Sequence, residues 1–221
     1  MPLELQEVDL SDSPALANVQ ISAFFNDPFQ KSLYPGMSFE SQLVGLIARW
    51  PANYHDFVGH WKKVIDTETG EVVSWSKWAF EFTDAGAELQ GPTGFPKDFK
   101  LEPLTSPKGL NEQLSTEIAR KFRESRERHL GERPQLQLKL MVTLPSCQRR
   151  GAASLQLFWA TEFADRHGLV CWTEASVVAV PVYKKFGFEA VDEIITEFDE
   201  SVGGGEYVSN CMIREPKRTS R

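Results

Sequence analysis

A short run of polar and small residues, Gln148-Arg149-Arg150-Gly151-Ala152-Ala153, lies where an apolar, strand-like segment gives way to a helical one. The start of a helix presents unpaired N–H groups and the positive end of the helix dipole. Small residues at 151–153 would let an anion such as a pyrophosphate approach that backbone closely, and the two arginines would add charge-assisted contacts. Taken alone, the run fits an ordinary strand-to-helix turn with a solvated arginine pair equally well.

A tyrosine downstream of this turn gives the pattern a second chemical group. Tyr183 lies in the segment Pro181-Val182-Tyr183-Lys184-Lys185-Phe186-Gly187-Phe188. A tyrosine among apolar residues on a short helix is more often a core residue whose hydroxyl is satisfied. Behind a phosphate-binding turn, it becomes a candidate acid that protonates a leaving thiolate.

Other reactive side chains point to no metal site and no covalent intermediate. The four histidines, His55, His60, His129 and His167, have no metal-ligand spacing on a single element. The three cysteines are an odd number without a paired spacing, so we expect reduced thiols and no disulfide framework. Cys147 lies inside the turn, but no histidine and acid accompany it as a nucleophile would require.

Hydrophobic periodicity and turn residues predict the elements that must position these groups. Helices are expected from Ser13, which would cap the first of them, to the Asn26-Asp27-Pro28 interruption, over 39–50 until Pro51 stops it, over 110–128, from the turn to Gly168, and over 180–186. Strands are expected over 57–66, 71–82, 135–144, 169–173, 188–198 and 207–213, and a long loop over 86–109.

Together, the turn and the tyrosine segment resemble the GNAT superfamily, the Gcn5-related N-acetyltransferases, and within it the fungal branch similar to puromycin N-acetyltransferase. The Q/R-x-x-G-x-G/A turn of the family matches Gln148, Gly151 and Ala153. Its aromatic-x-x-x-Gly-Phe segment matches the run from Tyr183 to Phe188. The close resemblance covers residues 136–190.

The resemblance also has departures. Ala152 and Ala153 stand where glycines are commonest, Thr143 and Leu144 make the end of the cofactor strand less typical, and residues 84–134 form a long insertion before that strand. Alanine at the final turn position is within the family pattern, so the resemblance still implies a bound coenzyme.

The fold implied by this resemblance is α/β of the GNAT type, a mixed and mostly antiparallel sheet flanked by helices, with a cofactor strand that splays from its neighbour near Thr143. Acetyl-coenzyme A would bind there, with backbone groups of Met141, Val142 and Thr143 pairing with its pantetheine arm. The residues expected around its pyrophosphate are Gln148, Arg149, Arg150, Gly151, Ala152, Ala153 and Ser154.

The reaction implied is direct attack of an amine on the thioester, with Tyr183 as the acid and a carboxylate as the general base. Glu174, at the end of the acidic strand before the tyrosine helix, is the expected base, and Glu81 on the hairpin strand is the second choice. For either carboxylate, a salt-bridged or solvated role is the more ordinary alternative.

Length and composition predict one domain over residues 1–221, with a loop-plus-helix insertion at 84–134 and a flexible tail at 215–221. The net charge of −7 argues against a nucleic-acid partner and favours a cationic acceptor. The N-terminus lacks the features of a signal peptide, and no run approaches the roughly 18 apolar residues of a membrane span. We therefore expect a cytoplasmic protein with no membrane partner.

Three functions fit this pattern. The first is N-acetylation of a small-molecule amine, the second is N-acetylation of a protein or peptide, and the third is non-catalytic binding of an acyl-coenzyme A. The 86–109 loop and the helix after it would roof the cleft and exclude a polypeptide, which favours the first.

Overall fold

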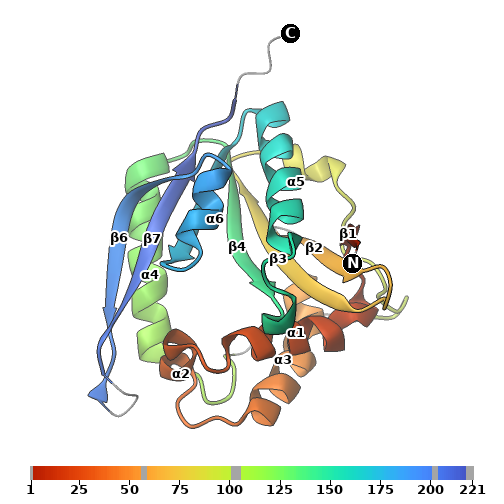
Figure 1. The fold of residues 1–221 in the computed structure, drawn as a ribbon, viewed down its shortest axis with the longest axis vertical. Coiled ribbons are helices and arrows are strands. Elements are labelled where there is room, and N and C mark those ends of the chain that lie inside the picture. The colour runs from red at the N-terminus through yellow and green to blue at the C-terminus, as the bar shows by residue number, and fades with distance from the viewer. Residues whose placement is uncertain (1, 56–58, 101–105, 201–203, 218–221) are drawn as a thin grey trace.

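The computed structural model describes residues 2–55, 59–100, 106–200 and 204–217, which form one sheet covered by helices on both faces (Figure 1). The strands are β1 (Leu3–Glu7), β2 (Gly59–Asp66), β3 (Val72–Glu81), β4 (Gln135–Thr143), β5 (Val170–Ser176), β6 (Glu189–Glu197) and β7 (Glu206–Arg214). The helices are α1 (Ser13–Phe24), α2 (Pro28–Leu33), α3 (Phe39–Tyr54), α4 (Glu112–Leu130), α5 (Ala152–His167) and α6 (Val180–Lys185).

The seven strands lie in the order β1-β2-β3-β4-β5-β7-β6. Within the described residues, β4 and β5 are parallel, and every other neighbouring pair is antiparallel. The mixed, mostly antiparallel sheet that the resemblance implies is thus confirmed.

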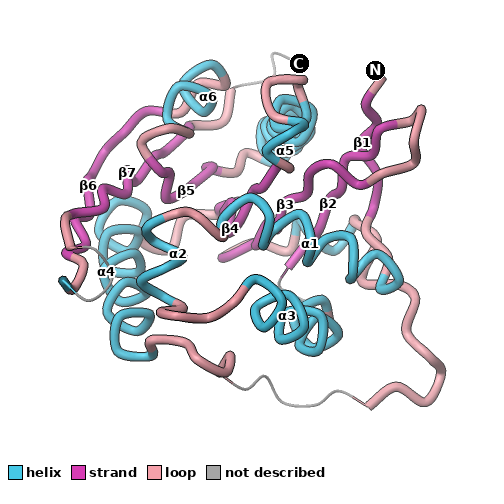
Figure 2. The backbone as a smooth tube through the Cα atoms, turned by 60° about the horizontal axis from the view of Figure 1, so that its bottom comes forward, coloured by secondary structure: helices cyan, strands magenta, loops and turns pink. Residues whose placement is uncertain are grey.

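Helices α5 and α6 cover one face of the sheet, and α1, α3 and α4 cover the other (Figure 2). Alternate residues of each strand face the two layers of helices, as a pleated strand requires. Leu136 and Leu138 pack with Phe163 of α5 on one side, whereas Trp172 packs with Leu130 of α4 on the other. A further cluster joins Trp50 of α3 to Trp75 of β3. We refer to these two sides as the α5 face and the α4 face.

The sheet divides between β4 and β5. The two strands pair from Gln135 with Val170 to Leu138 with Thr173, and each then continues without the other. The resemblance placed this separation near Thr143, and the structure places it earlier, directly after Leu138. The physical reason is a bulge: Trp78 of β3 pairs with Leu138 and Lys77 with Leu140, so Lys139 is an extra residue that bends β4. We call this point the fork, and it opens toward α2 (Figure 1).

Several predicted boundaries were wrong. Pro51 does not end its helix, because α3 continues to Tyr54 and the His55 N–H still bonds the Pro51 carbonyl at 3.0 Å. Ser13 does not cap α1, because it is already the first residue of that helix. The cap lies earlier, where Asp9 and Asp12 form a capping box at the start of the 3₁₀ turn Leu10–Asp12. The edge strand β1 and the six-residue helix α2 had no predicted counterpart.

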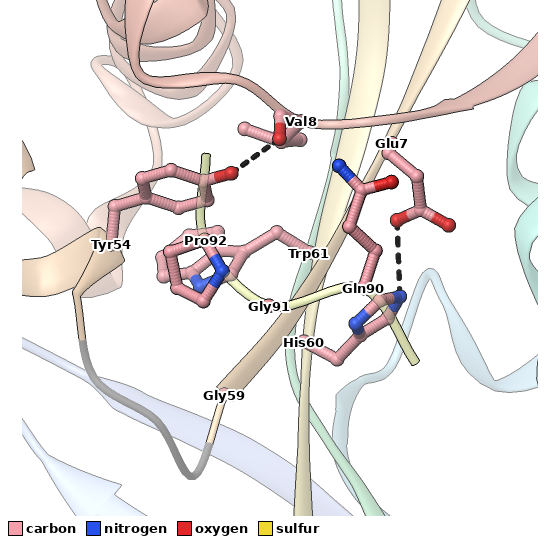
Figure 3. Close-up of a pocket in the computed structure, with 9 residues that line it drawn as sticks. All are labelled: Glu7, Val8, Tyr54, Gly59, His60, Trp61, Gln90, Gly91 and Pro92. Carbon is pink, nitrogen blue, oxygen red and sulfur yellow. Dashed lines mark hydrogen bonds and ion pairs between the residues drawn. The ribbon is translucent and has the colours of Figure 1, made fainter. Parts of the chain in front are cut away.

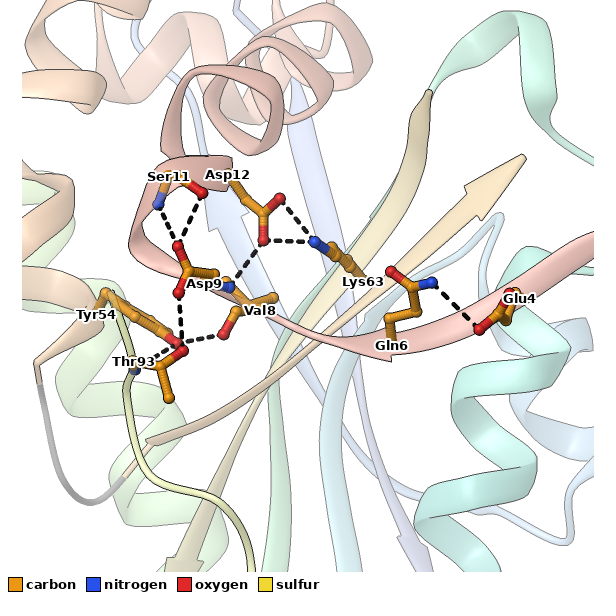
Figure 4. A network of polar contacts seen from close by, with 9 residues as sticks. All are labelled: Glu4, Gln6, Val8, Asp9, Ser11, Asp12, Tyr54, Lys63 and Thr93. Atoms are coloured by element: carbon orange, nitrogen blue, oxygen red, sulfur yellow. Dashed lines mark hydrogen bonds and ion pairs between the residues drawn. The ribbon is translucent and has the colours of Figure 1, made fainter. Parts of the chain in front are cut away.

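The first part of the 84–134 segment is tied to the corner between β1 and α1 (Figure 4). The Thr93 carbonyl accepts from Leu10 N–H at 3.1 Å, and its hydroxyl donates to Asp9 Oδ2 at 3.0 Å. The Thr93 N–H donates to the Tyr54 hydroxyl at 3.1 Å. The described part of the loop then packs on the end of α3, where the ring of Phe95 lies 5.7 Å from that of Tyr54. Farther along the chain, Asn111 N–H donates to the Leu33 carbonyl of α2 at 2.8 Å. It is therefore α2 and α4, and not the described part of the loop, that lie near the fork.

The C-terminal end of the described chain packs against the body of the protein. Glu215 pairs with Arg133, and Lys217 N–H donates to Asp165 Oδ1 at 2.7 Å, so residues 215–217 of the predicted flexible tail are held against the body. Residues 218–221 lie outside the described residues. Among the described helices, none is both long and apolar enough to cross a membrane.

Candidate functional site

The hydroxyl of Tyr183 lies at the fork, on the α5 face. Tyr183 is buried on α6 and forms a side-chain hydrogen bond with Thr173, which is the last residue of β5 to pair with β4. Thr173 Oγ1 in turn donates to the Leu138 carbonyl at 3.4 Å. Burial raises the pKa of Tyr183 to about 12. The phenol therefore stays protonated at ordinary pH and has a proton to donate.

The free edge of β4 borders the same fork. Leu144 N–H donates to the Val73 carbonyl of β3 at 2.9 Å, so alternation along β4 turns the backbone groups of Thr143 and Met141 away from β3 and toward the fork. Val142 is different, because its carbonyl accepts from Ser74 Oγ at 2.6 Å and its backbone faces β3. Of the three predicted pantetheine contacts, the geometry favours Met141 and Thr143 and leaves Val142 as a buried core residue.

A buried hydrogen-bond network joins the end of β4 to α5. Gln156 Nε2 donates to Ser74 Oγ at 2.8 Å, and the Ser74 and Thr143 hydroxyls lie 2.8 Å apart. Gln156 and Ser74 are fully buried, so both hold their positions. The sequence interpretation missed Gln156, and the available signal was a glutamine next to the apolar stripe of the helix.

The predicted anion-binding turn has the backbone that such a site needs. Arg149 adopts φ +60° and Gly151 φ +98°, and Gly151 precedes α5 without any side-chain cap. In the described chain, the N–H groups of Ala152, Ala153 and Ser154 have no hydrogen-bond acceptor. These donors at the positive end of a helix are the groups that bind phosphate.

The two arginines of the turn have different surroundings. Arg150 Nη2 pairs with Asp66 Oδ2 of β2 at 2.7 Å, and this contact raises the pKa of Arg150 and lowers that of Asp66. Arg149 is exposed and forms no side-chain ion pair or hydrogen bond with the described residues. Arg150 thus fastens the turn to the sheet, whereas Arg149 is available to an anion. Gln148 is exposed beside it, while Ala152 is buried beneath the turn.

Glu174 follows Thr173 on β5, so its side chain lies on the α4 face, opposite Tyr183. Trp172 Nε1 donates to Glu174 Oε1 at 2.6 Å. Removal from water raises the pKa of Glu174, while the Trp172 hydrogen bond and the nearby Lys139 and Arg126 partly offset that rise. A carboxyl group with a raised pKa binds a proton more readily than an ordinary glutamate does.

Glu81, the second candidate base, is engaged elsewhere. Its Oε2 lies 3.7 Å from Arg126 Nη2 of α4. The arrangement around the fork is therefore a protonated phenol on the α5 face and an ionisable carboxyl group on the α4 face.

A cavity at the opposite edge of the sheet does not belong to this site (Figure 3). It is lined by Glu7, Val8, Tyr54, Gly59, His60, Trp61, Gln90, Gly91 and Pro92. Two of its polar groups have partners: His60 Nε2 lies 3.2 Å from Glu7 Oε2, and the Tyr54 hydroxyl donates to the Val8 carbonyl. These contacts tie β1 to β2 and to the end of α3, and β2 lies two strands away from β4.

Comparison with known proteins identifies the fold. No family model and no curated protein matches the sequence. A solved structure from Corynebacterium glutamicum, described as histone acetyltransferase HPA2 and related acetyltransferase, superimposes with a TM-score of 0.64 at 19% identity, covering 100% of both chains. The mosquito arylalkylamine N-acetyltransferase like 5b superimposes with a TM-score of 0.61 at 10% identity, covering 97% of this chain and 100% of the other.

A third structure carries the family name. It is a GCN5-related N-acetyltransferase from Kribbella flavida, with a TM-score of 0.52, 13% identity and coverage of 96% of this chain and 97% of the other. At such identities the likeness concerns architecture, which here includes the mixed seven-stranded sheet and its flanking helices. The chain therefore has the fold of the GNAT N-acetyltransferases.

Proposed function

We propose that this protein transfers an acetyl group from acetyl-coenzyme A to the amine of a small molecule by direct attack. The observation that carries the proposal is the fork, with the buried hydroxyl of Tyr183 on one face and the carboxyl group of Glu174 on the other. A reaction in which the acyl donor and the amine meet from opposite faces requires such an opening through the sheet.

The residues present fit a bound coenzyme. The unbonded N–H groups at 152–154 and the exposed Arg149 would hold the pyrophosphate, with Gln148 and Gly151 shaping the turn. The free edges of Met141 and Thr143 would pair with the pantetheine arm. When bound, acetyl-coenzyme A supplies the thioester acyl group and the thiolate leaving group.

The protein's own part in the reaction is the control of two protons. Glu174, directly or through a water, would take a proton from the substrate's ammonium group, which leaves a neutral amine to attack the thioester. Its raised pKa suits it to that exchange. Tyr183 would hold a proton at its hydroxyl and give it to the departing sulfur. A backbone N–H of β4 at the fork would stabilise the oxyanion.

A small acceptor is supported by the elements that border the α4 face of the fork. The ring of Phe29 in α2 lies 4.9 Å from that of Tyr207 in β7, and Asn111 ties the start of α4 to the end of α2. These contacts close the region beside Ser176, to which Tyr207 is hydrogen-bonded. The fungal branch similar to puromycin N-acetyltransferase remains part of this proposal.

The test is a thiol-release assay with acetyl-coenzyme A across amines, polyamines, aminoglycosides, amino acids and peptides. We expect turnover with small amines and loss of most of it in Tyr183→Phe. Turnover confined to peptides would favour the protein acetyltransferase. Tight coenzyme binding without turnover on any amine would favour the non-catalytic binding domain.

A further inference from the structure

Lys139 and Glu174 occupy equivalent positions on the two arms of the fork. Leu138 and Thr173 form the last pair between β4 and β5, so Lys139 and Glu174 are the first residues beyond it. Neighbouring strands are about 4.8 Å apart where they pair. Groups just beyond the last pair are therefore close enough for one small molecule to contact both.

The two side chains also lie on the same face. Leu136 and Leu138 point to the α5 face, so Gln137 between them points to the α4 face. Lys139 Nζ donates to Gln137 Oε1 at 3.1 Å, which places the ammonium on that same side. Glu174 is there as well, and its charge acts on Lys139. This is the side from which the amine would approach.

In the part of the chain that the structure describes, Lys139 has no carboxylate partner of the kind that neighbouring Arg126 has in Glu81. Arg126 has Glu81 at 3.7 Å, whereas Lys139 has no carboxylate within ion-pair distance among the described residues. Its side chain is exposed at the fork, yet the surrounding sheet and helix remove enough water to lower its pKa. A partly desolvated ammonium with a single neutral acceptor keeps donors free for an anion.

A buried pair of glutamines fixes the acceptor to which the Lys139 ammonium is hydrogen-bonded. Gln137 Nε2 donates to Gln135 Oε1 at 2.9 Å, and both side chains are fully buried. That bond turns the Gln137 carbonyl oxygen toward Lys139. Gln135 Nε2 has no partner among the described residues. Because Gln137 is buried and hydrogen-bonded to Gln135, its carbonyl oxygen is a fixed acceptor for the Lys139 ammonium.

We propose that Lys139 binds a carboxylate of the acceptor whose amine lies beside Glu174, so that the acceptors are amino carboxylic acids. The inference rests on the proposed acetyltransferase function and narrows its substrate class. An ammonium and a carboxylate on one small molecule match in charge Glu174 and Lys139, which lie across the fork from each other.

The experiment uses matched pairs in which a neutral carboxamide replaces the carboxylate, phenylalanine with phenylalaninamide and alanine with alaninamide, each compared at a pH where both amines are deprotonated. We expect the wild type to prefer each free acid. Lys139→Met should lower kcat/KM for the acids by about ten- to a hundredfold, mainly through KM, because a charge-assisted contact is lost, and should leave the amides nearly unchanged. Lys139→Glu should shift preference toward a diamine such as putrescine.

Lys121→Met serves as the matched control, because Lys121 lies on α4 and pairs with Glu117 at 2.9 Å, away from β4. Coenzyme A affinity, measured by calorimetry, should be the same in all variants. Equal turnover of acids and amides by the wild type, or equal losses on both in Lys139→Met, overturns the inference and leaves the acetyltransferase intact. Coenzyme binding without turnover on any amine overturns both.

Discussion

The side chain of Thr173 is hydrogen-bonded to the hydroxyl of Tyr183, and the backbone of Thr173 pairs with Leu138 as the last pair before β4 and β5 separate. Thr173 thus ties the phenol to the point where the fork begins, directly before the bulge at Lys139. The next residue, Glu174, points to the opposite face and is bonded to Trp172. Alternation along a single strand places the two ionisable groups on opposite sides of the opening.

Tyr183→Phe should lower kcat by about a hundredfold while leaving KM and coenzyme affinity within about twofold, because it removes only an acid acting in the transition state. Since burial raises the pKa of Tyr183 to about 12, the wild type should show no alkaline loss of rate from this group below about pH 10. Steady-state kinetics across pH check both. Tyr34→Phe is the control, and unchanged kcat in Tyr183→Phe would refute the assignment.

As the pH is lowered, kcat/KM for acetyl transfer should fall with an apparent pKa above that of an ordinary glutamate. A base works only when deprotonated, and burial raises the pKa of Glu174, so the base is lost at a higher pH than a solvated carboxylate would give. Glu174→Gln should lower kcat/KM by about a hundredfold and abolish this fall at low pH, which is the acidic limb of the pH profile. Glu81→Gln should keep it. A limb that persists in Glu174→Gln would assign the base to another group.

Hydrophobic periodicity predicted the elements with a long apolar face, such as β4 and α5, and the turn residues predicted that Gly168 ends α5. It did not predict β1 or α2, which are short and owe their shape to neighbours: β1 pairs with β2, and α2 starts at an Asp27 cap. Pro51 misled the prediction because a proline in the last turn of a helix removes one bond and still allows the turn to finish.

At the site, the motifs located the turn and Tyr183, but the geometry depended on long-range pairing. The bulge at Lys139 is invisible in an alternating run, since it appears only when β3 is set beside β4. The separate roles of Arg149 and Arg150 depend on Asp66, which lies far away in the sequence. The role of Gln137 depends on which residues of β4 face α5.

Arg149→Gly should change stability and binding in opposite directions. A residue with a side chain loses about 1 kcal/mol of stability at φ +60°, and glycine does not. Arg149→Gly should therefore raise the free energy of unfolding by about 1 kcal/mol. The same change removes a charge from the anion site, so coenzyme A should bind several-fold more weakly. Denaturant unfolding and calorimetry measure the two effects. Arg149→Ala, which keeps the strain, should weaken binding without the gain, and equal stability of both variants would contradict the strain.

The anchor of the 84–134 segment should contribute to folding and not to coenzyme binding. Gly94 has φ +83°, and a Cβ at this position would lie 2.6 Å from the Asp9 carboxylate oxygens that hold Thr93 and Ser11. Gly94→Ala should therefore lower the free energy of unfolding by about 2 kcal/mol, from strain and the displaced carboxylate.

Gly91 provides a matched control in the same loop, because a Cβ there meets nothing within 4 Å and the backbone needs no positive φ. Gly91→Ala should stay within about 0.5 kcal/mol of the wild type. Coenzyme affinity and the acidic pH limb should be unchanged in both variants, because the anchor lies at β1 and α3, on the other side of β3 from the fork. A coenzyme affinity that fell in Gly94→Ala but not in Gly91→Ala would mean that this segment helps to form the coenzyme site.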